Sequence, residues 1–129
     1  MRAVDRKVVW FDTGFLPIAF GFTMCERAYY AALKKMCVKE PDRYELDGTG
    51  ACTHIIRRAD GKAPRLVCIV SLGDQRGLSR AQTVATLAHE AVHVWQTALE
   101  AMRQTGISGD EVEAYAIQYF TQCMVGEIM

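Results

Sequence analysis

The chain has 129 residues, of which 50% are hydrophobic and 23% charged, so it is long enough for one packed domain and too short for two. Its 15 lysines and arginines balance 15 aspartates and glutamates, and this zero net charge disfavours generic binding to a nucleic-acid backbone. Five cysteines without a C-x-x-C pair indicate reduced thiols in the cytoplasm, and no apolar stretch reaches the ~18 residues of a membrane span. We therefore expect a single cytoplasmic domain over residues 1–129, with no nucleic-acid or membrane partner.

The first third of the chain predicts a strand and then a helix. Residues 7–11 (KVVWF) are β-branched and aromatic and favour a short strand, which a loop containing proline and glycine follows. The apolar loop segment 15–20 is expected either to cap the core or to gate a cleft, and we favour the core. Thr23 with Glu26 fits a capping box, which predicts a helix that ends near residue 35 or 36.

A β-hairpin is expected next. Residues 52–58 and 65–72 favour two strands, and Asp60-Gly61 between them is a hairpin signal, so the pair should be antiparallel. Pro64 and two arginines on the first run indicate that one of the two strands is an edge strand, where a missing amide and exposed charges are tolerated.

Two helices should complete the domain. Ser79 with Gln82 forms a second capping box, which begins a long helix running to about Arg103. A last helix starts near residues 108–110 and runs towards Met124. The order of elements predicts an α+β fold, in which a small antiparallel or mixed sheet of about three strands packs against a backing helix and these two helices.

The long helix contains the sequence H-E-x-x-H. His89 and His93 lie about 40° apart around the helix and one turn apart along it, so both imidazoles can converge on one ion, for which Zn²⁺ is suited. Glu90 lies about 100° from His89, where a carboxylate can flank a metal-bound water and act as its general base. The motif also arises by chance in unrelated proteins, but the apolar residues around it here favour a buried metal helix.

A catalytic zinc usually has three protein ligands and one open position for water. His54 is a candidate third ligand, but it falls on a predicted strand, where a hydrogen-bonded structural histidine is the commoner case. Glu113 is the better candidate, because a carboxylate on an apolar helical face needs a partner; the alternative is a capping role at the start of its helix. Glu111 points the other way and is expected to be an N-terminal capping residue. The residues that share the face of Glu113 are Ala116, Ile117, Phe120 and Met124.

The pattern of His89, Glu90, His93 and Glu113 resembles the gluzincin-type zinc metallopeptidases, in which H-E-x-x-H is followed by a glutamate on the next helix. The run E-V-E-A-Y-A at 111–116 is also similar to the E-x-E-A-N-x-F-A run of the ImmA/IrrE peptidases, and the chain looks like small H-E-x-x-H proteins of phages and prophages. The resemblance covers residues 51–124. It implies a zincin-like domain.

In such a domain, His89, His93 and Glu113 would hold Zn²⁺, and Glu90 would be the general base for a zinc-activated water that hydrolyses a peptide bond in a protein or peptide. An edge strand of the hairpin would bind the extended substrate by strand addition.

The sequence departs from that family at two points. No histidine follows His93, and Ile117 stands four positions after Glu113, where the family has an acidic residue. An oxyanion-stabilising residue would have to come from His54 or from a tyrosine: Tyr29, Tyr30, Tyr44 or Tyr119. Two other interpretations stay open. One is a zincin-fold interaction module with structural zinc and little or no activity, and the other is an α+β domain without zinc.

Overall fold

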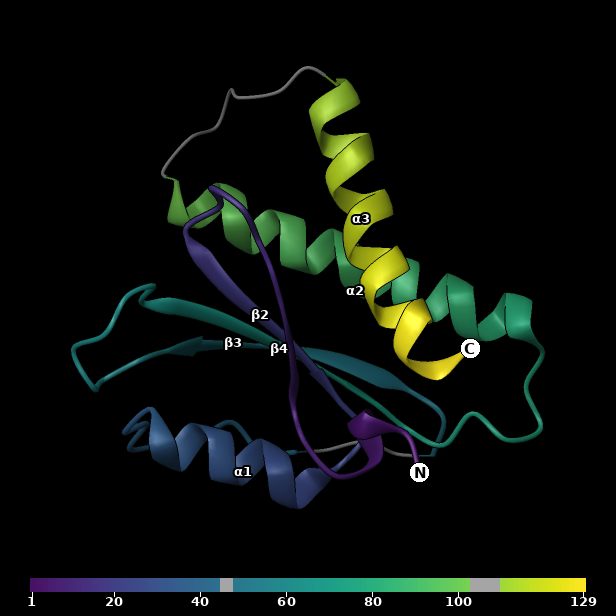
Figure 1. Ribbon diagram of the computed structural model, residues 1–129, viewed down its shortest axis with the longest axis horizontal. Coiled ribbons are helices and arrows are strands. Elements are labelled where there is room, and N and C mark those ends of the chain that lie inside the picture. Colours follow the sequence, from purple (N-terminus) through teal and green to yellow (C-terminus); the bar gives the residue numbers. More distant parts are fainter. Residues whose placement is uncertain (45–47, 103–109) are drawn as a thin grey trace.

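A computed structural model describes residues 1–44, 48–102 and 110–129 (Figure 1). Within these residues the chain forms a short 3-10 helix, four strands and three α-helices. In chain order the elements are η1 (Ala3–Asp5), β1 (Val9–Phe11), β2 (Ile18–Thr23), α1 (Glu26–Lys35), β3 (Ala51–Arg57), β4 (Leu66–Leu72), α2 (Arg80–Ala101) and α3 (Asp110–Ile128).

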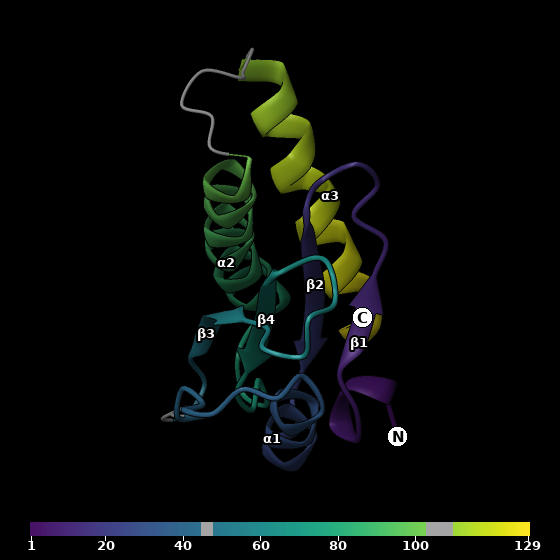
Figure 2. The same ribbon diagram turned by 90° about the vertical axis from the view of Figure 1, so that its left-hand side faces the viewer.

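The strands form one mixed sheet in the order β1-β2-β4-β3. β1 and β2 are antiparallel, β2 and β4 are parallel, and β4 and β3 are antiparallel. Helix α1 covers one face of the sheet, and α2 and α3 cover the other (Figures 1 and 2). The predicted α+β class and the antiparallel hairpin are confirmed, and β3 is the predicted edge strand. The sheet has four strands rather than about three.

Both faces of the central strands are buried, which explains why β4 is apolar along most of its length. On one face, Phe20 and Phe22 of β2 pack with Trp95 of α2 and Phe120 of α3. A smaller core on the other face joins α1 to the sheet through residues that include Tyr29, Leu33, Val67 and Ile69. The sheet is therefore the middle layer of a three-layer domain.

Strand β2 was expected to be a loop, because Gly21 interrupts the apolar segment. The structure shows why a glycine is needed in this strand. A Cβ atom there would lie 2.6 Å from Cγ1 of Val8, which directly precedes β1, and 2.9 Å from ring atoms of Trp10 in β1. The prediction that residues 15–20 pack in the core is correct for Ile18 and Phe20, which are buried, but Phe15 is 87% exposed.

The predicted capping box at the start of α1 is wrong. Thr23 is the last residue of β2, and its hydroxyl donates to the carbonyl of Lys7 and accepts from the amide of Cys25, both at 3.0 Å. The N-cap is Cys25, whose Sγ accepts from the amide of Ala28 at 3.4 Å. Thr23 therefore joins the strand to the helix without being the cap.

The capping box of α2 is confirmed. Ser79 Oγ accepts the amide of Gln82 at 3.1 Å, and Gln82 Oε1 accepts the amide of Ser79 at 2.8 Å. The described part of α2 ends at Ala101, and α3 begins at Asp110. The predicted helix end at residue 103 and helix start at residue 108 lie outside the described residues. None of the described helices is long and apolar enough to cross a lipid bilayer.

Removal of the α2 cap should destabilise the domain moderately. We expect Ser79→Ala to lower the free energy of unfolding by about 1 kcal/mol, because the amide of Gln82 loses the hydroxyl that accepts its hydrogen bond. Urea denaturation measures this as a lower midpoint with an unchanged slope. Ser79→Asp, which can still cap, is the control, and equal midpoints for the two variants would contradict the capping role.

Candidate metal centre

A polar pocket of about 500 Å³ opens between α2 and the edge strand β3. Both histidines of the motif line it. The lining residues from α2 are His89, Glu90, His93, Gln96, Thr97 and Glu100. Those from β3 are Ala51, Cys52, Thr53 and Ile55.

The two imidazoles of the motif converge. Nε2 of His89 and Nε2 of His93 are 3.3 Å apart, and the rings meet nearly edge to face at an interplanar angle of 77°. Two zinc–nitrogen bonds of about 2.0–2.1 Å at a tetrahedral angle would set the nitrogens about 3.3–3.4 Å apart. The observed separation therefore fits two ligands of one tetrahedral zinc ion.

Gln96 fixes the protonation of one of these rings. Its Oε1 lies 3.1 Å from Nδ1 of His93, and because a carbonyl oxygen only accepts, this contact is a hydrogen bond in the tautomer that carries its proton on Nδ1. The Nε2 atom of His93 then presents its lone pair to the pocket, as a metal ligand must. Gln96 follows His93 by three residues and so lies on the same side of α2, but helical spacing alone does not predict this contact.

Glu90 is buried, with a residue exposure of 5%, although it lines the pocket. The hydroxyl of Thr53 on β3 donates to its Oε2 at 2.5 Å and so orients the carboxylate between helix and strand. The sequence pattern did not predict this role of Thr53, because alternation along a strand does not reveal which helix a residue contacts. The predicted general base thus lies in the same pocket as the histidine pair.

Cys52 adds a thiol to the pocket without adding an obvious ligand. Burial, and to a smaller extent the nearby Glu90 carboxylate, raises the pKa of its thiol. Because metals bind the thiolate, the raised pKa of the thiol disfavours Cys52 as a metal ligand.

Glu113 is not brought together with the histidine pair. It lies near the start of α3, is exposed, and is not among the residues that line the pocket. Phe120 and Met124 of α3 pack in the core with Trp95, which lies about 240° around α2 from His89 and so faces away from the pocket. Among the described residues, no three His, Cys, Asp or Glu side chains form a group that could hold a metal ion. Glu113 as third ligand therefore stays a prediction, and Glu111 is exposed too.

His54 lies on the opposite side of β3 from Thr53. It is buried, its Nε2 is 2.8 Å from Ser71 Oγ, and its ring packs against Tyr29 at a centroid distance of 4.5 Å. This placement agrees with the interpretation of His54 as a structural strand histidine. None of the four tyrosines considered as oxyanion stabilisers lines the pocket.

Burial of His54 should make stability depend on pH. Burial lowers the pKa of its imidazole from the usual 6.5, while Asp42 and Glu90 partly oppose this. The folded state thus favours the neutral ring. The contribution of His54 to stability is therefore present above pH 6.5 and is lost as the pH falls from 6.5 through the folded-state pKa. We expect His54→Gln to flatten this part of the urea-midpoint profile, and an unchanged profile would contradict the effect.

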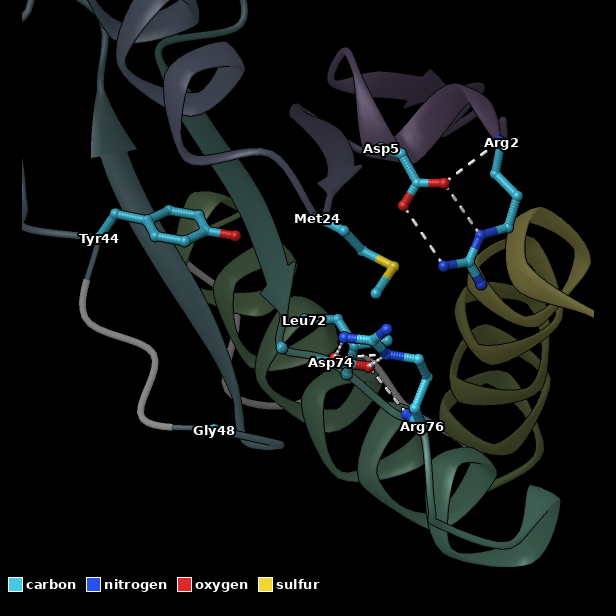
Figure 3. A pocket seen from close by; sticks show the side chains of 9 residues that line it. Arg2, Asp5, Met24, Tyr44, Gly48, Leu72, Asp74 and Arg76 are labelled. Carbon is cyan, nitrogen blue, oxygen red and sulfur yellow. Dashed lines mark hydrogen bonds and ion pairs between the residues drawn. The ribbon is translucent and has the colours of Figure 1, made fainter.

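A second polar cavity, of about 510 Å³, lies beside η1 (Figure 3). Two arginines reach it, and each is paired with an aspartate: Arg2 with Asp5 at 3.2 Å and Arg76 with Asp74 at 2.5 Å. Its described lining contains no histidine or cysteine. Because both guanidinium groups are neutralised locally, this cavity is a weaker candidate for chemistry than the histidine pocket.

Comparison with known proteins adds no relative: no protein-family model, no curated protein and no solved structure matches this chain. The candidate site therefore depends on its own geometry and on the sequence pattern.

Proposed function

We propose that this protein is a zinc-dependent metallopeptidase of the cytoplasm that hydrolyses peptide bonds in a protein or peptide. The observation that carries the proposal is the 3.3 Å approach of the Nε2 atoms of His89 and His93 beside the buried carboxylate of Glu90. Imidazole nitrogens at this spacing suit a tetrahedral zinc ion. The resemblance to gluzincins and to phage-encoded H-E-x-x-H proteins supports the same function.

The three residues of the motif would have two different roles, zinc binding and general-base catalysis. His89 and His93 would hold the ion, with Gln96 fixing the tautomer of His93. Bound zinc would polarise the scissile carbonyl and acidify the attacking water. Glu90, oriented by the Thr53 hydroxyl, would accept the proton of that water and pass it to the leaving amine.

The third ligand that we propose is Glu113, and this part of the proposal rests on the sequence pattern alone. Glu113 is exposed on α3 and does not line the pocket. To bind the same zinc ion as the two histidines, its carboxylate would have to move towards the pocket.

Strand β3 supplies a means of binding the substrate. Among the described strands it pairs only with β4, and its free edge borders the pocket, so its unpaired backbone groups are available to an extended peptide. A peptide added along this edge would run past the histidine pair. We propose this as the substrate-binding mode.

One observation favours a second candidate function. Only two of the three predicted ligands line one pocket, which is compatible with an interaction module that has weak zinc binding and no hydrolysis. A peptide that binds without being cleaved, with equal affinity in wild-type protein and Glu90→Gln, would support this alternative.

The direct test is to incubate the zinc-loaded protein with a diverse peptide library and to identify new termini by mass spectrometry. We expect cleavage products that disappear with a zinc chelator and return when zinc is restored. A zinc-loaded protein that yields no products beyond a mock preparation would contradict the peptidase proposal.

Gln96 provides a further prediction. Replacing it with alanine should weaken zinc binding by about 10–100-fold, because the Nδ1 proton of His93 loses its acceptor. Competition with a fluorescent zinc chelator measures the affinity. Gln118→Ala, an exposed change on α3, is the control, and identical affinities for the two variants would contradict the role of Gln96.

A further inference from the structure

A small apolar cavity lies on the other face of the sheet from the histidine pocket. It has a volume of about 310 Å³ and is formed by β1, β2, α1 and the turn between β3 and β4. The apolar residues that line it are Trp10, Phe11, Ala19, Phe20, Ala32 and Met36. Figure 2 shows β1 at the opposite edge of the sheet from β3. This cavity is therefore remote from the proposed zinc centre and independent of it.

The cavity exists because small residues leave room beside a large one. The indole of Trp10 lies against Gly21, whose missing Cβ would be 2.9 Å from the ring. Ala19 on β2 and Ala32 on α1 do not fill the space next to this ring. Trp10 remains 46% exposed, so an aromatic wall faces the opening rather than being sealed in the core.

The rim of the cavity is cationic. Arg58 is neutralised by Asp60, to which it is joined at 2.8 Å. Lys35 and Lys62 also line the cavity, and neither forms an ion pair with another residue in the part of the chain that the structure describes. Two positive charges thus border an apolar hollow, and an apolar ligand with an anionic head group would match both features.

We propose that this cavity binds a small amphipathic carboxylate, namely a free medium-chain fatty acid. The alkyl chain lies against Trp10 between Ala19 and Ala32, where it replaces water on exposed aromatic surface. The carboxylate lies at the rim, between the ammonium groups of Lys35 and Lys62. The inference does not rest on zinc or on peptidase activity.

The two tryptophans of the chain allow a direct test, because Trp10 lines this cavity and Trp95 does not. Protein labelled with 5-fluorotryptophan gives one ¹⁹F resonance for each, and Trp10→Phe assigns them. We expect decanoate to shift the Trp10 resonance in a saturable manner and to leave that of Trp95 in place. Decanol should bind at least tenfold more weakly, and decyltrimethylammonium more weakly still.

Matched variants locate the site. Ala32→Leu, which fills the cavity, should abolish the Trp10 shift, whereas Ala31→Leu, an exposed change one residue away, should preserve it. Lys35→Gln with Lys62→Gln should weaken decanoate at least tenfold without changing decanol. The exposed pair Lys34→Gln with Lys39→Gln should have little effect.

Three results would overturn the inference. They are a shift of the Trp95 resonance in place of Trp10, equal affinities for decanoate and decanol, and equal decanoate binding by the two lysine double variants. If Ala32→Leu does not fold, as judged by circular dichroism, the surface lysine variants still decide the question.

Discussion

Replacing Glu90 by glutamine is expected to lower the rate of peptide hydrolysis by about 10²–10⁴-fold while leaving zinc bound. Glutamine has the shape of glutamate, and its amide oxygen can still accept the hydroxyl of Thr53. It cannot take a proton from water at neutral pH. The substitution therefore removes the proposed base and retains the pocket.

The matched control is Glu100→Gln. Glu100 lines the same pocket two to three turns further along α2, but it is exposed and paired with Arg57 at 3.2 Å. Its removal should change the rate less than twofold. Rates are measured on one cleaved peptide from the library at equal zinc occupancy, and equal rates for Glu90→Gln and wild-type protein would refute the role of Glu90.

Replacing His93 by alanine should produce the second large effect, which is the loss of tight zinc binding. The variant lacks one of the two converging nitrogens. Its zinc affinity should therefore fall further than that of Gln96→Ala, for which a loss of about 10–100-fold is expected. At a free zinc concentration 100 times its dissociation constant, wild-type protein should gain about 2.7 kcal/mol of stability. His93→Ala should gain almost none.

Thermal unfolding of metal-free protein with and without added zinc measures this difference. His54→Gln is the matched control, because it removes a histidine that lies outside the pocket. It should lower stability but preserve the zinc-dependent increase. A zinc-dependent increase in His93→Ala equal to that of wild-type protein would show that the ion binds elsewhere.

Local signals in the sequence predicted several elements well. Ser79 and Gln82 mark the start of α2 because a capping box needs only neighbours in the chain. The hairpin of β3 and β4 was predictable for the same reason. β2 was missed because Gly21 weakens a strand signal. A glycine is needed at that position because Val8 and Trp10, from the segment that contains β1, pass close to it. Thr23 is a residue type that often caps helices, but here it is the last residue of β2.

In the candidate site, too, the residues set by local geometry were predictable and those set by distant contacts were not. His89, Glu90 and His93 come from one helical turn, so their shared location follows from helical geometry. Thr53 and Gln96 act through contacts that single-sequence patterns do not specify: one comes from a distant strand and the other depends on side-chain orientation. Glu113 was inferred from an apolar helical face. That face packs on the side of α2 remote from the histidines, and Glu113 itself is exposed.

The most direct test of the proposed zinc site is a crystal structure of zinc-loaded protein with anomalous data collected on both sides of the zinc absorption edge. We predict a zinc peak in the pocket between α2 and β3, with Nε2 of His89 and Nε2 of His93 each about 2.0–2.1 Å away. The same map identifies the third ligand and shows whether it is Glu113. Fully zinc-loaded crystals with no peak within bonding distance of these two nitrogens would contradict the proposal that His89 and His93 bind zinc.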